Sequence, residues 1–120
     1  MEKYDDKEII CACLSVYSDF DNLQPVRDFL THKNWEIRMQ AAVCLGRYGF
    51  EEDIKYLAAA TTDSEWWVRY RSAQALAKIP TMTVQKLREI ADQTADCFSR
   101  DVILRVTTER EVAESCGLSY

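Results

Sequence analysis

The stretch 63-DSEWWVRYRSAQALAKIP-80 decides the fold, because much the same pattern stands earlier in the chain as 32-HKNWEIRMQAAVCLGRYG-49. When Trp35 is set against Trp66, the two stretches agree in size and polarity at a constant offset of 31. The aligned pairs include Arg38 with Arg69, Ala42 with Ala73, Leu45 with Leu76, and Gly49 with Pro80. Glycine and proline both end helices, so the two copies share an end as well as a pattern. A repeat of this length is typical of stacked architectures.

Each copy predicts two helices. Apolar residues recur at spacings of three and four, which places them on one face of a helix. They stand at positions 37, 41, 44, 45 and 48 in one copy, and the other copy repeats the stripe at 68, 72, 75, 76 and 79 with the small Ser72 in place of Ala41. Shorter second helices follow, with Ile54, Leu57 and Ala58 in one copy and Val84, Leu87 and Ala91 in the other. Asp63 is the expected N-cap of the helix after it. No alternating pattern indicates a strand, so we expect no sheet.

The two copies have neighbours on both sides. A third, more degenerate copy precedes them at the same offset and aligns Cys13 with Cys44, but it lacks the tryptophan and the arginine. A final helix follows, with a stripe of Val102, Ile103, Val106 and Ala113 and a charged outer side typical of a terminal cap. We therefore predict a single all-α domain over residues 1–120, an α-solenoid of about three helical hairpins with a C-terminal capping helix. The hairpins are placed at 8–31, 34–61 and 64–95, and the cap at 98–115.

The patterns W-E-I-R-x-x-A-A-x-x-L-G and D-S-E-W-W-V-R-x-x-S-A-x-A-L-A resemble HEAT repeats. The resemblance covers about residues 9–113 and is to the short bacterial form, which also occurs in proteins of the phycobilisome-lyase type. The tetratricopeptide and ankyrin motifs, which have similar periods, are missing. The resemblance implies a solenoid that binds or scaffolds other proteins and has no catalytic activity.

The same resemblance implies a structural role for the recurring arginines, Arg38 and Arg69. In the family this arginine pairs with an acidic residue at the hairpin turn and ties neighbouring repeats together, and Asp63 is the matching residue in the second copy. The first copy has His32 at that position, so we expect an interrupted ladder there, with Asn34 or Thr31 capping the helix instead.

Composition excludes several classes of function. The net charge of −5 works against non-specific binding to nucleic-acid phosphates. The five cysteines are odd in number and poorly spaced for a metal site, so we interpret them as small apolar side chains in a reducing compartment. No targeting or membrane-spanning pattern is visible, which predicts a cytoplasmic protein without membrane insertion. The single histidine, His32, supports no catalytic triad, so neither an enzyme nor a cofactor is expected.

Trp67 departs from the repeat, because its counterpart is Glu36, whereas Trp66 matches Trp35 and is expected to pack between repeats. Two interpretations of Trp67 compete: it lies over the C-terminal cap near Phe98, or it is an exposed anchor for a partner. Aromatic and cationic side chains are concentrated here. The structural repeat positions are Trp35, Arg38, Asp63, Trp66 and Arg69.

The leading hypothesis for function is a non-catalytic protein-binding or scaffold module. A solenoid offers a concave surface lined by its second helices, which here would carry Arg27, Lys55 and Arg88 together with Asp28, Glu51, Asp53 and Glu89. This mixture of charges favours a protein or peptide partner. The candidate partner-binding residues are Trp67, Tyr70, Arg71, Lys55 and Arg88.

Other functions stay open at the level of sequence. The chain could be the C-terminal part of a larger bacterial protein. It could also be an oligomerisation module whose N-terminal end stacks on a second copy, or an accessory, lyase-like subunit of an enzyme.

Overall fold

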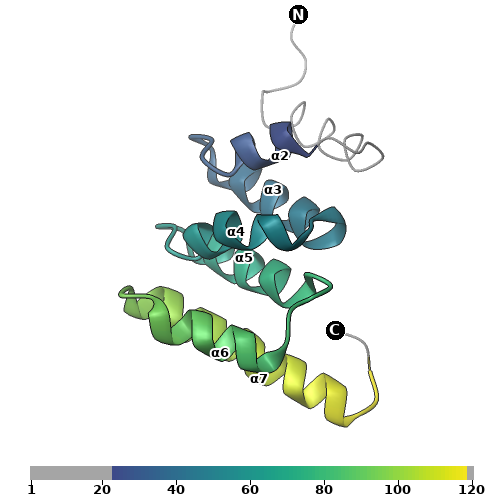
Figure 1. The fold of residues 1–120 in the computed structure, drawn as a ribbon. Coiled ribbons are helices and arrows are strands. Elements are labelled where there is room, and N and C mark those ends of the chain that lie inside the picture. The colour runs from purple at the N-terminus through teal and green to yellow at the C-terminus, as the bar shows by residue number, and fades with distance from the viewer. Residues whose placement is uncertain (1–22, 119–120) are drawn as a thin grey trace, which may run out of the picture.

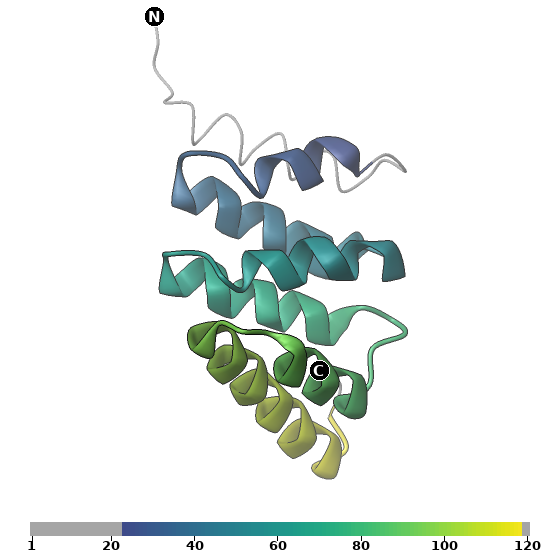
Figure 2. The same cartoon turned by 60° about the vertical axis from the view of Figure 1, so that its left-hand side comes forward.

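Long and short helices alternate along the chain and form two layers. The computed structural model describes residues 23–118. Its helices are α2 (Gln24–Phe29), α3 (Trp35–Tyr48), the 3₁₀ helix η1 (Glu51–Asp53), α4 (Ile54–Ala60), α5 (Trp66–Lys78), α6 (Val84–Gln93) and α7 (Cys97–Ser115). Helices α3, α5 and α7 stack in one layer, and α2, α4 and α6 lie over them in the other (Figures 1 and 2). The described residues contain no strand, so the predicted all-α solenoid is confirmed.

The predicted apolar stripes form the core. All five stripe positions of the second copy are buried, four of them in α5 and the fifth, Ile79, at its C-cap; four of the five in α3 are buried too. Tyr48 is the exception, with 37% of its surface exposed, so its assignment to the core was wrong. It is the last residue of α3 and lies beside the Arg47 side chain, where the helix turns into the following loop.

Small residues let α3 and α5 approach closely. A Cβ added to Gly46 would lie 2.8 Å from both Cα and Cβ of Ala75, closer than carbon atoms approach without displacement. Ala42 and Ala73 are also buried, on α3 and α5 respectively. The two copies therefore match in side-chain size at these positions because their helices stack through them.

The helix starts differ in part from expectation. Asn34 caps α3 by accepting a hydrogen bond from the Glu36 N–H at 2.9 Å, which is one of the two caps predicted there. Asp63, however, is not the N-cap of α5. The helix begins at Trp66, and the Asp63 carboxylate accepts from the Glu65 N–H just before it.

Helix α7, the last helix of the described residues, also carries the repeat pattern. Arg38, Arg69 and Arg100 are successive at an offset of 31, and each donates a hydrogen bond to the carbonyl oxygen six residues earlier. These distances are 2.7, 2.9 and 3.0 Å. The predicted cap is therefore built as the first helix of a further unit. Val102, Ile103 and Val106 are buried against the preceding helices.

The cysteines do not share one environment. Cys44 is buried, and this burial raises the pKa of its thiol. Cys97 and Cys116 are exposed, so the interpretation of these two as apolar core residues was wrong. Cys11 and Cys13 lie outside the described residues. Over residues 23–118, no helix has the length and apolar character needed to cross a bilayer.

Candidate functional site

Three chemically different residues make the same turn before helices α3, α5 and α7. His32 Nδ1 accepts from the Asn34 N–H at 3.0 Å, and Asp63 Oδ1 accepts from the Glu65 N–H at 2.9 Å. Thr94 Oγ1 accepts from the Asp96 N–H at 3.3 Å. These three positions follow one another at the offset of the repeat. The turn needs only an acceptor atom close to the backbone, which the Nδ1 of histidine, the Oδ1 of aspartate and the Oγ1 of threonine each supply.

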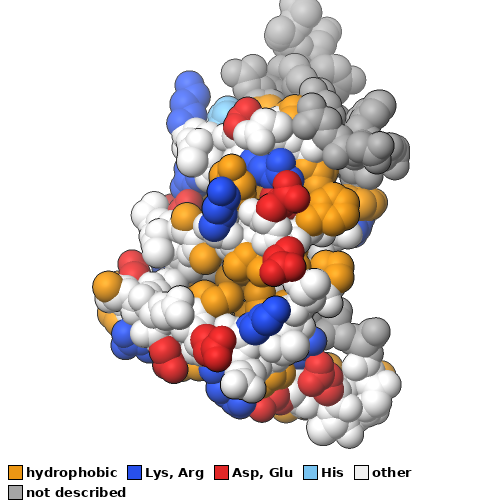
Figure 3. Space-filling model, viewed as in Figure 1, with side chains coloured by type: hydrophobic (Ala, Val, Ile, Leu, Met, Phe, Trp, Pro, Cys, Tyr) orange, Lys and Arg blue, Asp and Glu red, His pale blue; other side chains and the backbone are white. Residues whose placement is uncertain are grey.

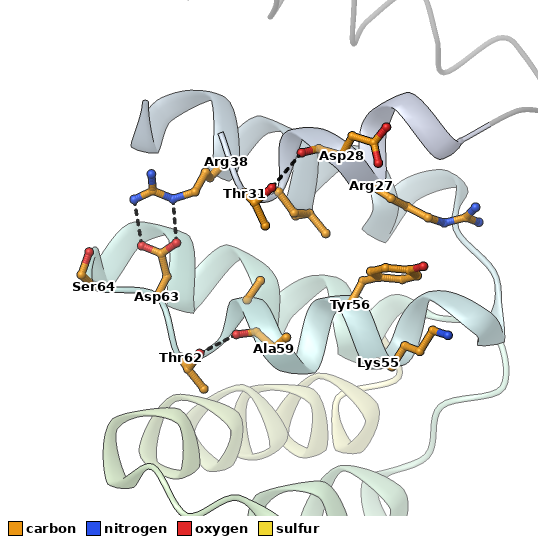
Figure 4. A pocket seen from close by; sticks show the side chains of 12 residues that line it. Arg27, Asp28, Thr31, Arg38, Lys55, Tyr56, Ala59, Thr62, Asp63 and Ser64 are labelled. Carbon is orange, nitrogen blue, oxygen red and sulfur yellow. Dashed lines mark hydrogen bonds and ion pairs between the residues drawn. The ribbon is translucent and has the colours of Figure 1, made fainter. Parts of the chain in front are cut away.

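Asp63 also ties two units together. Its carboxylate accepts two hydrogen bonds from Arg38, from Nε at 2.7 Å and from Nη2 at 3.0 Å (Figure 4). The partner of Asp63 is therefore the arginine of the preceding unit, and its assignment to Arg69 within its own copy was wrong. The reason is geometric: Arg69 directs Nη1 at the Asp63 and Ser64 carbonyl oxygens and not at the carboxylate.

An aromatic cluster, defined as Trp66, Trp67 and Tyr70, lies at the start of α5. Trp66 stacks on Tyr70 with ring centroids 5.0 Å apart, and it meets Trp67 edge-to-face at 4.9 Å. Trp66 is 39% exposed and Trp67 is 47% exposed. The three rings therefore form a contiguous, partly exposed aromatic surface rather than single exposed side chains. Trp66 thus packs between units only in part.

Arginines lie against the faces of these rings. The Arg71 guanidinium is 5.8 Å from the centroid of Trp67. Arg105 of α7 lies 5.6 Å from Trp66 and 5.7 Å from Tyr70. These contacts constrain the orientations of the three rings.

Tyr70 also links α5 to α7. Its hydroxyl donates to the Glu109 carboxylate at 3.0 Å, from one helix to the other. Partial burial and this hydrogen bond together raise the pKa of Tyr70. Sequence reasoning missed Arg105 and Glu109, since nothing in the repeat marks them as neighbours of Tyr70.

A small pocket lies between α5 and α7, next to the aromatic cluster. It has a volume of about 240 Å³ and is lined by Trp66, Arg69, Phe98, Asp101, Val102 and Arg105. Trp66 and Phe98 both line this pocket, whereas Trp67 is not among its lining residues. Trp67 lies beside it with nearly half of its surface open.

A second hollow lies in the other layer, between α2 and α4 (Figure 4). This groove has a volume of about 770 Å³, and Arg27, Lys55 and Tyr56 line it. Arg27 donates to the Asp53 carboxylate, which is fully buried, and this hydrogen bond raises the pKa of Arg27. Asp53 is thus a structural residue, and its placement on an open binding surface was wrong.

The candidate residues therefore fall into separate groups. Trp67, Tyr70 and Arg71 come together on α5, while Lys55 lies in the groove of the other layer. Arg88, on α6, forms an ion pair with Glu111 of α7 at 2.6 Å. Figure 3 shows the face that carries α2, α4 and α6, where apolar side chains are interspersed with both charges.

Comparison with known families agrees with this geometry. The family model for HEAT repeats matches the chain twice, over residues 3–77 and 23–105. Neither the curated proteins nor the solved structures include a match to the chain.

Proposed function

Since the chain belongs to the HEAT-repeat family, we propose that it is a non-catalytic module that binds a protein or peptide partner through the aromatic cluster. HEAT repeats are commonly scaffolds for protein interaction. Catalysis is not proposed, because the sequence gives the only histidine, His32, no recognisable nucleophile or acid–base partner. The proposed partner is a protein, given the acidic balance of the chain.

The observation that carries this proposal is the exposure of adjacent, mutually ordered tryptophans. Tryptophan and arginine dominate the binding energy of protein interfaces, where they fill desolvated pockets. Trp66 and Trp67 offer this area with their rings already fixed by Tyr70, Arg71 and Arg105. The groove between α2 and α4 is the weaker candidate, because its arginines are already paired with Asp53 and Asp63.

Replacing Trp67 tests the proposal. The immobilised chain should capture its partner from a lysate of the native host, and Trp67→Ala should abolish that capture. Phe50→Ala is the matched control, because Phe50 is 57% exposed but lies beyond the opposite end of the hairpin, after α3. It should capture the partner as the unmodified chain does.

Thermal unfolding separates binding from folding. Both variants should lose less than about 1 kcal/mol of stability, because both side chains are substantially exposed. Retained capture by Trp67→Ala would contradict the proposal. A loss of about 3–5 kcal/mol would instead identify Trp67 as a core residue.

A further inference from the structure

Arg69 has an unused hydrogen-bonding edge that its counterpart in the preceding unit uses. Both arginines direct Nη1 at two turn carbonyls: those of residues 32 and 33 for Arg38, and those of residues 63 and 64 for Arg69. The Nε/Nη2 edge of Arg38 holds the Asp63 carboxylate in a bidentate pair. Among residues 23–118, no carboxylate or hydrogen-bond acceptor occupies that edge of Arg69.

The reason is one substitution within the repeat. Thr94 is the counterpart of Asp63 in the next unit, at the position from which a carboxylate would reach Arg69. Threonine keeps the turn, since its Oγ1 accepts the Asp96 N–H, but it has no negative charge to offer. The half-buried Arg69 guanidinium lies over the Phe98 ring instead, at 5.4 Å from the centroid. Stacking occupies the face of a guanidinium and leaves its edge able to donate.

Arg69 lines a pocket in which cationic side chains outnumber acidic ones. Arg69 and Arg105 line the same pocket of about 240 Å³, against one acidic residue, Asp101. Arg105 has its ion-pair partner on its own helix, the Glu109 carboxylate at 3.7 Å from Nε. The rings of Trp66 and Phe98 form the other walls of the pocket. A guanidinium that lies on an aromatic ring keeps its edge available, and a bidentate, charge-assisted pair with a carboxylate there is stronger than a neutral hydrogen bond.

We propose that this pocket binds an aspartate or glutamate side chain of the partner, with its carboxylate on the Nε/Nη2 edge of Arg69 as Asp63 lies on Arg38. This inference rests on the proposed function and adds the chemistry of the partner: an acidic segment that contacts the aromatic cluster. Asp101 competes with the incoming carboxylate for the two arginines and lowers its affinity.

The experiment supplies the Nε/Nη2 edge of Arg69 with a carboxylate from the chain itself. Thr94→Asp places a carboxylate where Asp63 stands in the preceding unit, and Thr94→Asn is the uncharged control. The probe is a short fluorescein-labelled peptide of alternating glutamate and leucine, with a glutamine counterpart, and binding is followed by anisotropy at low salt. The unmodified chain should prefer the glutamate peptide by at least about tenfold, as one charge-assisted bidentate pair supplies.

Thr94→Asp and Arg69→Gln should remove this preference, and Thr94→Asn should keep it. Asp101→Asn should strengthen binding of the glutamate peptide. Thr94→Asp retains the Arg69 hydrogen bonds to the turn, so it stays informative if Arg69→Gln unfolds. Equal binding of the two peptides, or a preference that persists in Thr94→Asp, would overturn the inference. A labelled oligothymidylate that binds more tightly than the glutamate peptide would overturn it too, in favour of nucleic acid.

The proposed function has its own readout. If Trp67→Ala no longer captures the native partner while Thr94→Asp still does, the aromatic cluster binds a partner. The inference that this partner presents an acidic segment to Arg69 is then refuted. If the glutamate preference holds while Trp67→Ala still captures the partner, the pocket binds anions and the role of the cluster is refuted.

Discussion

At the scale of single residues, the same position can serve one task or two. His32, Asp63 and Thr94 all accept the backbone N–H that shapes the turn, and only Asp63 also neutralises an arginine of the preceding unit. The turn requires an acceptor, whereas the tie between units requires a charge. Thr94 therefore leaves Arg69 cationic and unpaired with a carboxylate in the described part of the chain, without any change of backbone.

Asp53 provides a residue-scale prediction about stability. Its buried carboxylate accepts from Arg27 and from the Phe50 N–H at 2.9 Å, so Asp53→Ala strands a cation and a backbone donor. We expect a loss of about 3 kcal/mol in urea unfolding. Glu52→Ala is the matched control. Glu52 forms a longer, exposed ion pair with the same arginine, at 3.7 Å, so its loss should cost less than about 1 kcal/mol. Equal losses would mean that burial of the pair contributes nothing.

At the scale of the helix, spacing predicts the buried face and not the ends. The stripe of α5 is buried as predicted because spacings of three and four fix one face wherever the helix continues. Tyr48 and the two tryptophans stand in terminal turns, where the next element and not the periodicity determines exposure. A further copy of the repeat in α7 could have been found from Arg100, which follows Arg69 at the offset of 31. Cys97 and Ser99 stand there in place of Trp66 and Val68, so the rest of the pattern is hard to recognise.

The close approach of α3 and α5 makes a helix-scale prediction. Gly46→Ala improves helix propensity by about 1 kcal/mol, which alone would stabilise α3. The new methyl group, however, meets the backbone of Ala75 at 2.8 Å, and backbone cannot rotate away. Overpacking of this kind costs about 1–3 kcal/mol, so we expect net destabilisation in urea unfolding with an unchanged m-value. A more stable variant would show that the two helices separate easily.

At the scale of the whole molecule, two layers present two different surfaces. The layer of α3, α5 and α7 carries the aromatic cluster, and the layer of α2, α4 and α6 carries the groove with Lys55 and Tyr56 (Figures 1 and 4). The repeat made the architecture predictable, and the departure of Trp67 from the repeat is what makes it a candidate for binding. Arg105 and Glu109 were not predictable, because their contacts with α5 arise from how α7 packs and not from sequence spacing.

Oxidative footprinting of the captured complex tests the central claim most directly, because hydroxyl radicals label exposed aromatic side chains on both surfaces. Our account predicts that partner binding protects Trp66, Trp67 and Tyr70, while Tyr56 in the groove and Phe50 at the far end react as in the free chain. Protection of Tyr56 with unchanged labelling of the aromatic cluster would contradict it, and would place the partner on the layer of α2, α4 and α6.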